Sequence, residues 1–133
     1  MVQDYIKSII HEYEEDLRKV KQSGYVLQYV NEQTHELCLE AVKNDGFSLR
    51  YVKEQTNEIC LQAIKQNSYA IHLVKEQTYE LCLEAVKQHG YALQYIKKQT
   101  PELCREAVKQ YPYTLHFIND HLLITQLQQE FGL

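Results

Sequence analysis

The sequence predicts an all-α protein, a short α-solenoid of 22-residue helix-turn-helix repeats with N- and C-terminal capping helices. Two observations support this prediction. Gln-Thr pairs, cysteines, alanines and lysines each recur four times at a step of 22 residues, and such self-similarity is typical of stacked repeats. The threonines and cysteines are Thr34, Thr56, Thr78, Thr100, Cys38, Cys60, Cys82 and Cys104. Within each unit, the apolar residues follow a helical spacing.

The longer helix of each unit is predicted to begin after the threonine. In the unit 90–111, Thr100 is a good N-cap, Pro101 suits the first helical position, and Glu102 lies near the positive end of the helix dipole. Four apolar residues at one-and-four spacing then share a face: Leu103, Cys104, Ala107 and Val108. We therefore expect an amphipathic helix of about three turns.

The end of the longer helix is marked by glycine or a substitute for it. We expect Gly46 and Gly90 to adopt the left-handed conformation that ends helices. Ser68 replaces glycine in one unit, and there the preceding Asn67 is expected to adopt that conformation. Pro112 cannot continue a helix.

A shorter helix of about two turns is predicted for the rest of the unit, as in residues 91–97, where Tyr91 and Tyr95 lie one α-helical turn apart. Isolated helices this short are marginal in water. Each unit must therefore bury its apolar face against the units before and after it.

The whole chain, residues 1–133, is expected to form a single domain. Residues 1–23 are predicted to be an N-terminal capping helix, because terminal repeats need a polar outer surface and this segment is rich in charge. Residues 24–111 hold four repeats, and residues 112–133 hold a partial repeat and a C-terminal capping helix. The apolar stripe of that last helix consists of Leu123, Ile124, Leu127 and Phe131.

Two segments of the repeat resemble a known family. Residues 85–96 read AVKQHGYALQYI and residues 41–52 read AVKNDGFSLRYV. They resemble the AVKQNGYALQYV-like units of an uncharacterised family of short tandem α-helical repeats, a domain of unknown function found in bacterial and giant-virus proteins. The resemblance extends over roughly residues 24–118. It implies a helical repeat array and brings no catalytic residues with it.

The evenly spaced cysteines are expected to be small apolar core residues. Equivalent positions on packed helices lie ~8 to 10 Å apart, whereas a disulfide needs Cα atoms within about 7 Å. The closely spaced ligand pairs of zinc sites are absent from the sequence. We therefore expect no disulfide, metal or cofactor, and we expect a cytoplasmic protein, because free thiols favour a reducing compartment.

Aromatic residues recur in the shorter helices, and they admit two interpretations. They could be stacking platforms for nucleic-acid bases, but their helical spacing favours large core residues whose hydroxyls reach the rim. The recurring tyrosines and phenylalanine are Tyr25, Tyr29, Phe47, Tyr51, Tyr69, Tyr91, Tyr95 and Tyr113.

A row of lysines could bind an anionic partner: Lys43, Lys65, Lys87 and Lys109. Lysine in the last turn of a helix also suits the helix dipole, so a solvated face explains the row. The net charge is −4, and residues 24–111 contain 11 acidic and 10 basic residues. Because helical RNA readers present a basic surface, nucleic acid is disfavoured as a partner.

Catalytic and membrane-spanning signatures are absent from the sequence. It contains no glycine-rich phosphate loop, nucleophile elbow or paired-carboxylate motif, and no apolar run approaches the roughly 20 residues that cross a bilayer. We therefore expect a protein that is neither an enzyme nor membrane-bound.

The candidate binding residues are those that differ between repeats, because scaffold positions must agree while contact positions need not. One such row runs along the shorter helices: Gln28, Arg50, His72, Gln94 and His116. Two other variable rows, at the two ends of the longer helices, are alternatives: His35, Asn57, Tyr79 and Pro101, and Asp45, Asn67, His89 and Tyr111.

We hypothesise that the first row recognises a protein partner. The expected function is a protein–protein interaction scaffold, an adaptor or a small inhibitor acting by occlusion, in a monomer or weak homo-oligomer. The alternative is a nucleic-acid-binding helical repeat protein.

Overall fold

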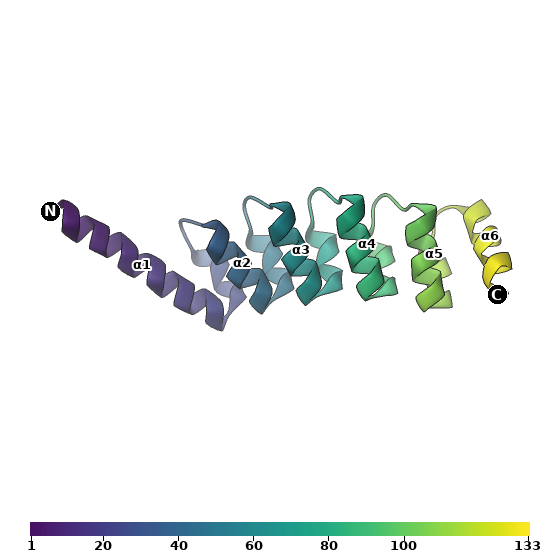
Figure 1. The fold of residues 1–133 in the computed structure, drawn as a ribbon, viewed down its shortest axis with the longest axis horizontal. Coiled ribbons are helices and arrows are strands. Elements are labelled where there is room, and N and C mark those ends of the chain that lie inside the picture. Colours follow the sequence, from purple (N-terminus) through teal and green to yellow (C-terminus); the bar gives the residue numbers. More distant parts are fainter.

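The computed structural model describes all of residues 1–133 and contains six α-helices that alternate with five 3-10 helices, without strands (Figure 1). The α-helices are α1 (Val2–Gln22), α2 (His35–Asn44), α3 (Asn57–Gln66), α4 (Tyr79–Gln88), α5 (Pro101–Gln110) and α6 (His121–Phe131). The 3-10 helices are η1 (Gly24–Tyr29), η2 (Gly46–Tyr51), η3 (Ser68–Leu73), η4 (Gly90–Tyr95) and η5 (Pro112–Phe117). The predicted all-α fold is confirmed.

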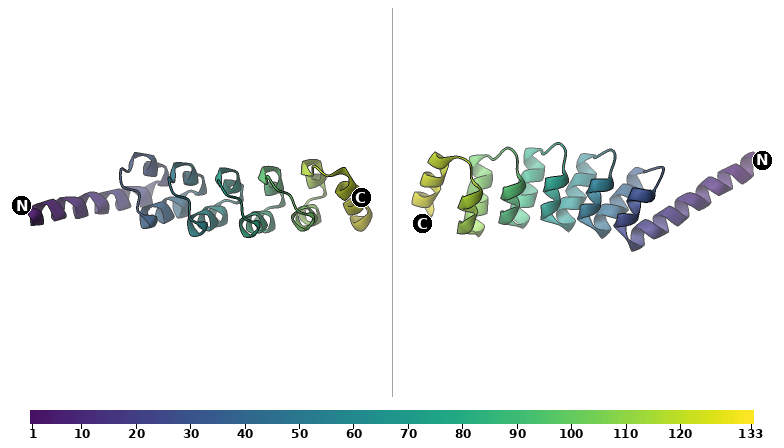
Figure 2. Two further views of the ribbon diagram at one scale, coloured as in Figure 1. Left: turned by 90° about the horizontal axis from the view of Figure 1, so that it is seen from above. Right: turned by 180° about the vertical axis from the view of Figure 1, so that it is seen from behind.

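The units stack along one line. Helices α2 to α5 stand side by side in Figure 1, and the view from above in Figure 2 shows them in one layer with the 3-10 helices in a second layer. One continuous core of 29 buried apolar residues runs between the layers. The predicted short helical solenoid is therefore confirmed.

The longer helices form as the sequence predicts. Each capping threonine accepts a hydrogen bond from the backbone N–H three residues later, at 3.2 Å for Thr34 and Thr56 and 3.3 Å for Thr78 and Thr100. The predicted apolar face is buried in every unit; in α2 it consists of Leu37, Cys38, Ala41 and Val42. All four cysteines are buried and free, as expected.

The shorter helices are 3-10 helices rather than α-helices, and this changes which residues face the core. A 3-10 helix has three residues per turn, so side chains at i and i+3 point the same way. In the first unit Gly24, Leu27 and Val30 are buried at this spacing, and the second and fifth residues of the helix, Tyr25 and Gln28, share another face. The prediction of about two turns holds, but the assumed α-helical period was wrong.

The glycines at the starts of the 3-10 helices serve close packing and not left-handed backbone. Gly132 is the one residue with a positive φ, so the predicted left-handed conformation of Gly46, Gly90 and Asn67 is wrong. A Cβ atom at Gly46 would lie 2.5 Å from the carbonyl oxygen of Ala63 in the next longer helix. The absence of a side chain at Gly24, Gly46 and Gly90 therefore lets η1, η2 and η4 approach the next longer helix closely.

A glutamine side chain joins each unit to the next at the turn that precedes the longer helix. The amide of Gln55 donates to the carbonyl oxygen of Leu73 at 3.0 Å and accepts from the N–H of Lys75 at 3.0 Å. Gln33, Gln77 and Gln99 make the equivalent pair of bonds to the following unit. This recurring contact is called the glutamine clamp below.

A second amide joins the units at the other end of the longer helix. The side chain of Gln110 accepts from the N–H of Gly90 at 2.9 Å and donates to the carbonyl oxygen of Val86 at 2.8 Å. Asn44 makes both kinds of bond to the unit before it, to Gly24 and Lys21. Neighbouring units are thus hydrogen-bonded at both ends of the α-helical layer.

The two terminal helices differ in how they end the solenoid. Helix α6 lies beside α5 and buries Leu127 completely. The second half of α1 packs on the first unit through Val20, whereas its first half projects beyond the solenoid (Figures 1 and 2). That half exposes Tyr5 and Ile6 among other apolar side chains, so the expectation of a polar outer surface is wrong for this helix.

Candidate protein-binding surface

The 3-10 face is the outer surface formed by the second and fifth residues of each 3-10 helix. Period three aligns these two positions, and stacking repeats them from unit to unit. The 3-10 face consists of Tyr25, Gln28, Phe47, Arg50, Tyr69, His72, Tyr91, Gln94, Tyr113 and His116. It contains the whole of the row predicted to bind a partner.

The predicted row is largely exposed to solvent. Arg50, His72, Gln94 and His116 are exposed, and Gln28 is half-buried. All except Arg50 are held by their own 3-10 helix, because each side chain hydrogen-bonds the carbonyl oxygen three residues before it, at 2.6 to 3.2 Å. These side chains are therefore already ordered before any partner binds.

The two histidines of the row have a defined tautomer. The Nδ1 atom of His72 lies 2.6 Å from the carbonyl oxygen of Tyr69, and Nδ1 of His116 lies 2.9 Å from that of Tyr113. A carbonyl oxygen only accepts, so in the neutral ring Nδ1 carries the proton and Nε2 is an acceptor. Each ring thus offers an acceptor nitrogen as well as an aromatic surface.

Aromatic rings of neighbouring 3-10 helices contact one another at every boundary between repeats. Ring centroids lie 5.3 Å apart between Tyr25 and Tyr51, and 5.8 Å apart between Phe47 and His72. The ring of Tyr95 lies 5.4 Å from that of His72, and Tyr91 contacts Phe117 at 6.0 Å. The predicted row is therefore set among tyrosine, phenylalanine and histidine rings that contact one another at each boundary and are called the aromatic band below.

The exposure of these rings corrects the expectation that the tyrosines belong to the core. Tyr29 is 70% exposed and Tyr113 is 60% exposed, and Tyr25 and Tyr95 are also exposed. The other aromatic residues of the shorter helices are half-buried at the rim. The error follows from the period, because a four-residue spacing aligns side chains on an α-helix but not on a 3-10 helix.

One of the alternative rows changes its role along the chain. Asp45 and Asn67 cap their 3-10 helices, accepting from the N–H two residues later at 2.9 and 3.0 Å. His89 instead stacks on Tyr111 with centroids 5.3 Å apart and lies 3.2 Å from the hydroxyl of Tyr69. This row is structural in the early units and joins the aromatic band in the later ones.

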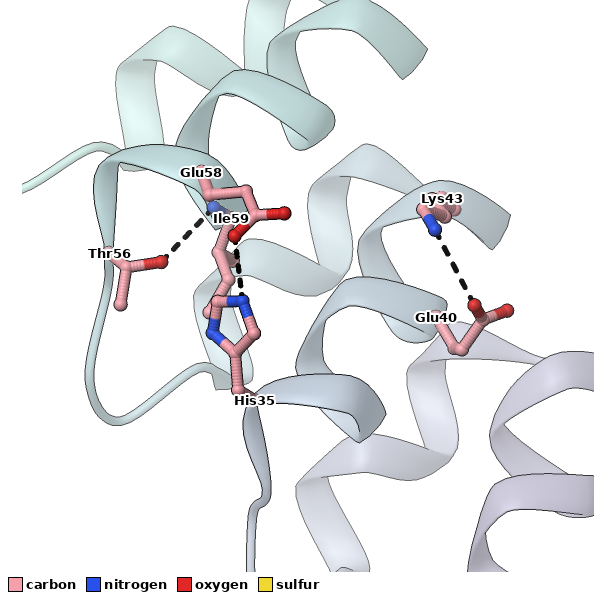
Figure 3. A network of polar contacts seen from close by, with 6 residues as sticks. All are labelled: His35, Glu40, Lys43, Thr56, Glu58 and Ile59. Atoms are coloured by element: carbon pink, nitrogen blue, oxygen red, sulfur yellow. Dashed lines mark hydrogen bonds and ion pairs between the residues drawn. The ribbon is translucent and has the colours of Figure 1, made fainter.

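The other alternative row forms a polar link between α-helices at its first member alone. His35 at the start of α2 lies 2.9 Å from the carboxylate of Glu58 at the start of α3 (Figure 3). Nearby, Lys43 pairs with Glu40 on the same helix at 3.6 Å. The lysine row to which Lys43 belongs is exposed along the α-helical layer, as a solvated face would be.

Hollows beneath the loops show no arrangement of reactive groups. The two between the first turns measure about 340 and 260 Å³ and are lined mainly by polar side chains, with Cys38 beside one and Cys60 beside the other. Burial raises the pKa of these thiols, and that of Cys104 rises to about 11. A thiol held in its neutral form is a poor nucleophile.

Comparison with known families identifies the repeat. The model of a family described as a domain of unknown function (DUF4116) matches residues 17–56, 34–77 and 78–123. The chain belongs to this family. The three matches follow one another along the solenoid, which confirms the resemblance to an uncharacterised repeat domain. No curated protein and no solved structure matches the DUF4116 chain. None of its helices has the length and apolarity needed to cross a membrane.

Proposed function

We propose that this DUF4116 protein is a non-enzymatic scaffold that binds a protein partner through the 3-10 face. The observation that supports the proposal is the exposed band of tyrosine and histidine rings, in contact across every repeat boundary. Tyrosine and arginine dominate the energetics of protein interfaces, and this face presents Arg50 among several tyrosines. The proposed role is that of a cytoplasmic adaptor, or of a small inhibitor that covers its partner.

Pre-organisation of the face favours tight binding. Binding normally costs about 0.5 to 1.5 kcal/mol for each flexible side chain that becomes ordered. Gln28, His72, Gln94 and His116 are already bonded to their own helices, and tyrosine itself has only two rotatable side-chain angles. Most of this cost is therefore met when the repeats fold.

A nucleic-acid ligand is the alternative, because exposed tyrosines also stack on bases. Against it stands the near balance of 11 acidic and 10 basic residues in 24–111. On the 3-10 face Arg50 is the one residue with a permanent positive charge, whereas single-stranded nucleic acids are held by positively charged grooves. The balance of charge favours a protein partner.

The test is a paired capture experiment from source cells. Arg50→Glu with His72→Glu places two negative charges in the aromatic band and is expected to weaken binding of the captured partner by at least about tenfold. Lys65→Glu with Lys87→Glu makes the same kind of change on the α-helical layer and should leave binding unchanged. Binding is then measured by calorimetry with purified partner.

Three results would contradict the proposal. The first is that no protein is captured reproducibly, and the second is that both double variants bind the partner as the natural sequence does. The third is retention of RNA or DNA that weakens as salt rises and is lost when Lys43, Lys65 and Lys87 become Glu, which would favour the nucleic-acid alternative.

A further inference from the structure

The first half of α1 presents an apolar stripe that nothing in the chain covers. Every residue from 1 to 12 is exposed. The large apolar side chains of this segment lie on one side of the helix. Four of them are exposed by 48% to 73%: Val2, Tyr5, Ile6 and Ile9. Ile10 and the half-buried Tyr13 complete the stripe, which spans an arc of ~140° on an ideal helical wheel.

Such a stripe is large for a free surface. Together the side chains expose on the order of 500 Å² of mainly apolar surface, which is within the range of about 300 to 600 Å² seen for the largest patches on monomers, many of them functional. The same side of α1 continues into Leu17 and Val20, which pack on the first unit. A helix laid along the stripe would therefore continue an interface that the protein already uses.

The order of the apolar residues shows which helix fits. Their positions 2, 5, 6, 9, 10 and 13 map onto themselves when the sequence is reversed about the point between Lys7 and Ser8. Two antiparallel copies would therefore set Val2 level with Tyr13, Tyr5 with Ile10, and Ile6 with Ile9. Apolar residues then meet apolar residues at every level, on both helices.

We propose that α1 pairs with α1 of a second copy of this chain, antiparallel and about a two-fold axis that crosses the stripe between Ile6 and Ile9. A two-fold interface uses the same surface of both subunits, which is what a stripe with reversed symmetry provides. The two solenoids extend in opposite directions from the paired helices. The dimer buries on the order of 1,000 Å² in total, the lower limit for a specific interface, so it is of modest affinity.

Charge also favours the antiparallel pair. A hollow of about 490 Å³ lies between α1 and the first unit, lined by Ile9, Tyr13 and the carboxylates of Glu12, Asp16 and Glu32 among others. The antiparallel partner brings Val2 and the positive end of its helix dipole to this hollow. Parallel helices would instead place the acidic segments 12–16 of the two copies side by side.

The reach of the partner helix fits the space available. The hydroxyl of Tyr13 donates a hydrogen bond to Glu36 in the first turn of α2, so α1 contacts the solenoid at this level. Val2 of the second copy lies level with Tyr13 in the proposed pair. The paired segments, residues 2–13 of each copy, therefore stop where the solenoid begins. A membrane surface is a poorer match, because interfacial helices carry lysine and arginine on the polar face, whereas residues 1–16 contain one lysine and five acidic residues.

The test measures self-association of the full chain by sedimentation equilibrium over a range of concentrations. We expect twice the mass of one chain at high concentration. Ile6→Asp with Ile9→Asp should weaken association by more than about tenfold, since four carboxylates would face one another across the dimer. Ser8→Asp with His11→Asp places the same charges on the polar side of α1 and should leave association unchanged. Circular dichroism checks that both variants fold.

Orientation is tested by disulfide formation between two singly substituted chains. A mixture of Ile6→Cys and Ile9→Cys should cross-link mainly between the two different chains if the helices are antiparallel. Cross-linking of each variant mainly with itself would overturn the antiparallel pair. The mass of a single chain at every concentration would overturn the dimer. So would a monomeric protein that binds lipid vesicles and loses this binding when Ile6→Asp is combined with Ile9→Asp.

Discussion

The glutamine clamp gives a physical reason for one of the most regular residues in the sequence. Gln55 satisfies one carbonyl oxygen and one backbone N–H of the next unit, in a turn where no backbone group is placed to do so. Its Oε1 atom also lies 3.7 Å from the thiol of Cys60, which can donate to it. A single side chain therefore fixes the distance and the register between two repeats.

Loss of one clamp should destabilise the protein measurably. Gln55→Ala leaves the carbonyl of Leu73 and the N–H of Lys75 without this partner, so we expect the free energy of unfolding to fall by about 1 to 3 kcal/mol. Gln62→Ala removes the same kind of side chain from α3, where it makes no hydrogen bond, and should change stability by less than about 0.5 kcal/mol. Urea denaturation compares the two, and equal effects would contradict the role of the clamp.

The buried thiols predict a loss of stability at alkaline pH. Burial raises the pKa of all four cysteines above the ordinary value of 9.0, to about 11 for Cys104. The folded state therefore holds its thiol protons more tightly than the unfolded state does. The stability that the protonated thiols contribute is fully present below about pH 9 and is lost as the pH rises towards 11. Thermal melts followed by circular dichroism should show Tm falling in that window, and falling less when Cys104 is replaced by Ala.

At the scale of elements, the α-helices could be predicted and the 3-10 helices could not. Thr56 and its equivalents mark helix starts, and four apolar residues per helix define the buried face. In a six-residue helix, burial of two residues three apart, such as Gly24 and Leu27, is compatible with either helix type. The sequence therefore leaves the period open, and the period decides which tyrosines face water.

The candidate site was predicted in part for the same reason. Variation between repeats makes Arg50 and His72 candidates for binding, and this prediction does not depend on the helix type. An α-helical period predicts that the surrounding tyrosines face the core, whereas the 3-10 period exposes several of them. The clamping role of Gln55 was missed although it recurs at the repeat step, because its partners lie 18 and 20 residues away and depend on how units stack.

Helix α6 should protect the last repeat, so that destabilising α6 also destabilises α5. Leu127 is fully buried beneath it, so Leu127→Ala should cost about 2 to 5 kcal/mol. Leu122→Ala removes a leucine that is 69% exposed on the same helix and should cost less than about 0.5 kcal/mol. Hydrogen exchange should show faster opening of α5 in the Leu127 variant, with α3 unchanged. Equal acceleration in α3 and α5 would show that the repeats do not open from the end.

At the scale of the whole molecule, stability is distributed along a line. Each interior unit contacts the unit before it and the unit after it, through the buried face, the glutamine clamp and the second amide. Stability in such a protein is close to a sum of unit and neighbour contributions. Units should therefore be removable one at a time, provided that the step of 22 residues is kept.

Deletion of residues 57–78 tests this most directly, because it removes one whole unit and joins Thr56 to Tyr79. The measurement is small-angle X-ray scattering with circular dichroism, made on the Ile6→Asp and Ile9→Asp background so that self-association does not contribute. The shortened chain should keep its helical content per residue, melt at a lower temperature and lose about 10 Å, one helix spacing, from its longest dimension. An unfolded or aggregated product, or an unchanged longest dimension, would contradict a linear stack of interchangeable units.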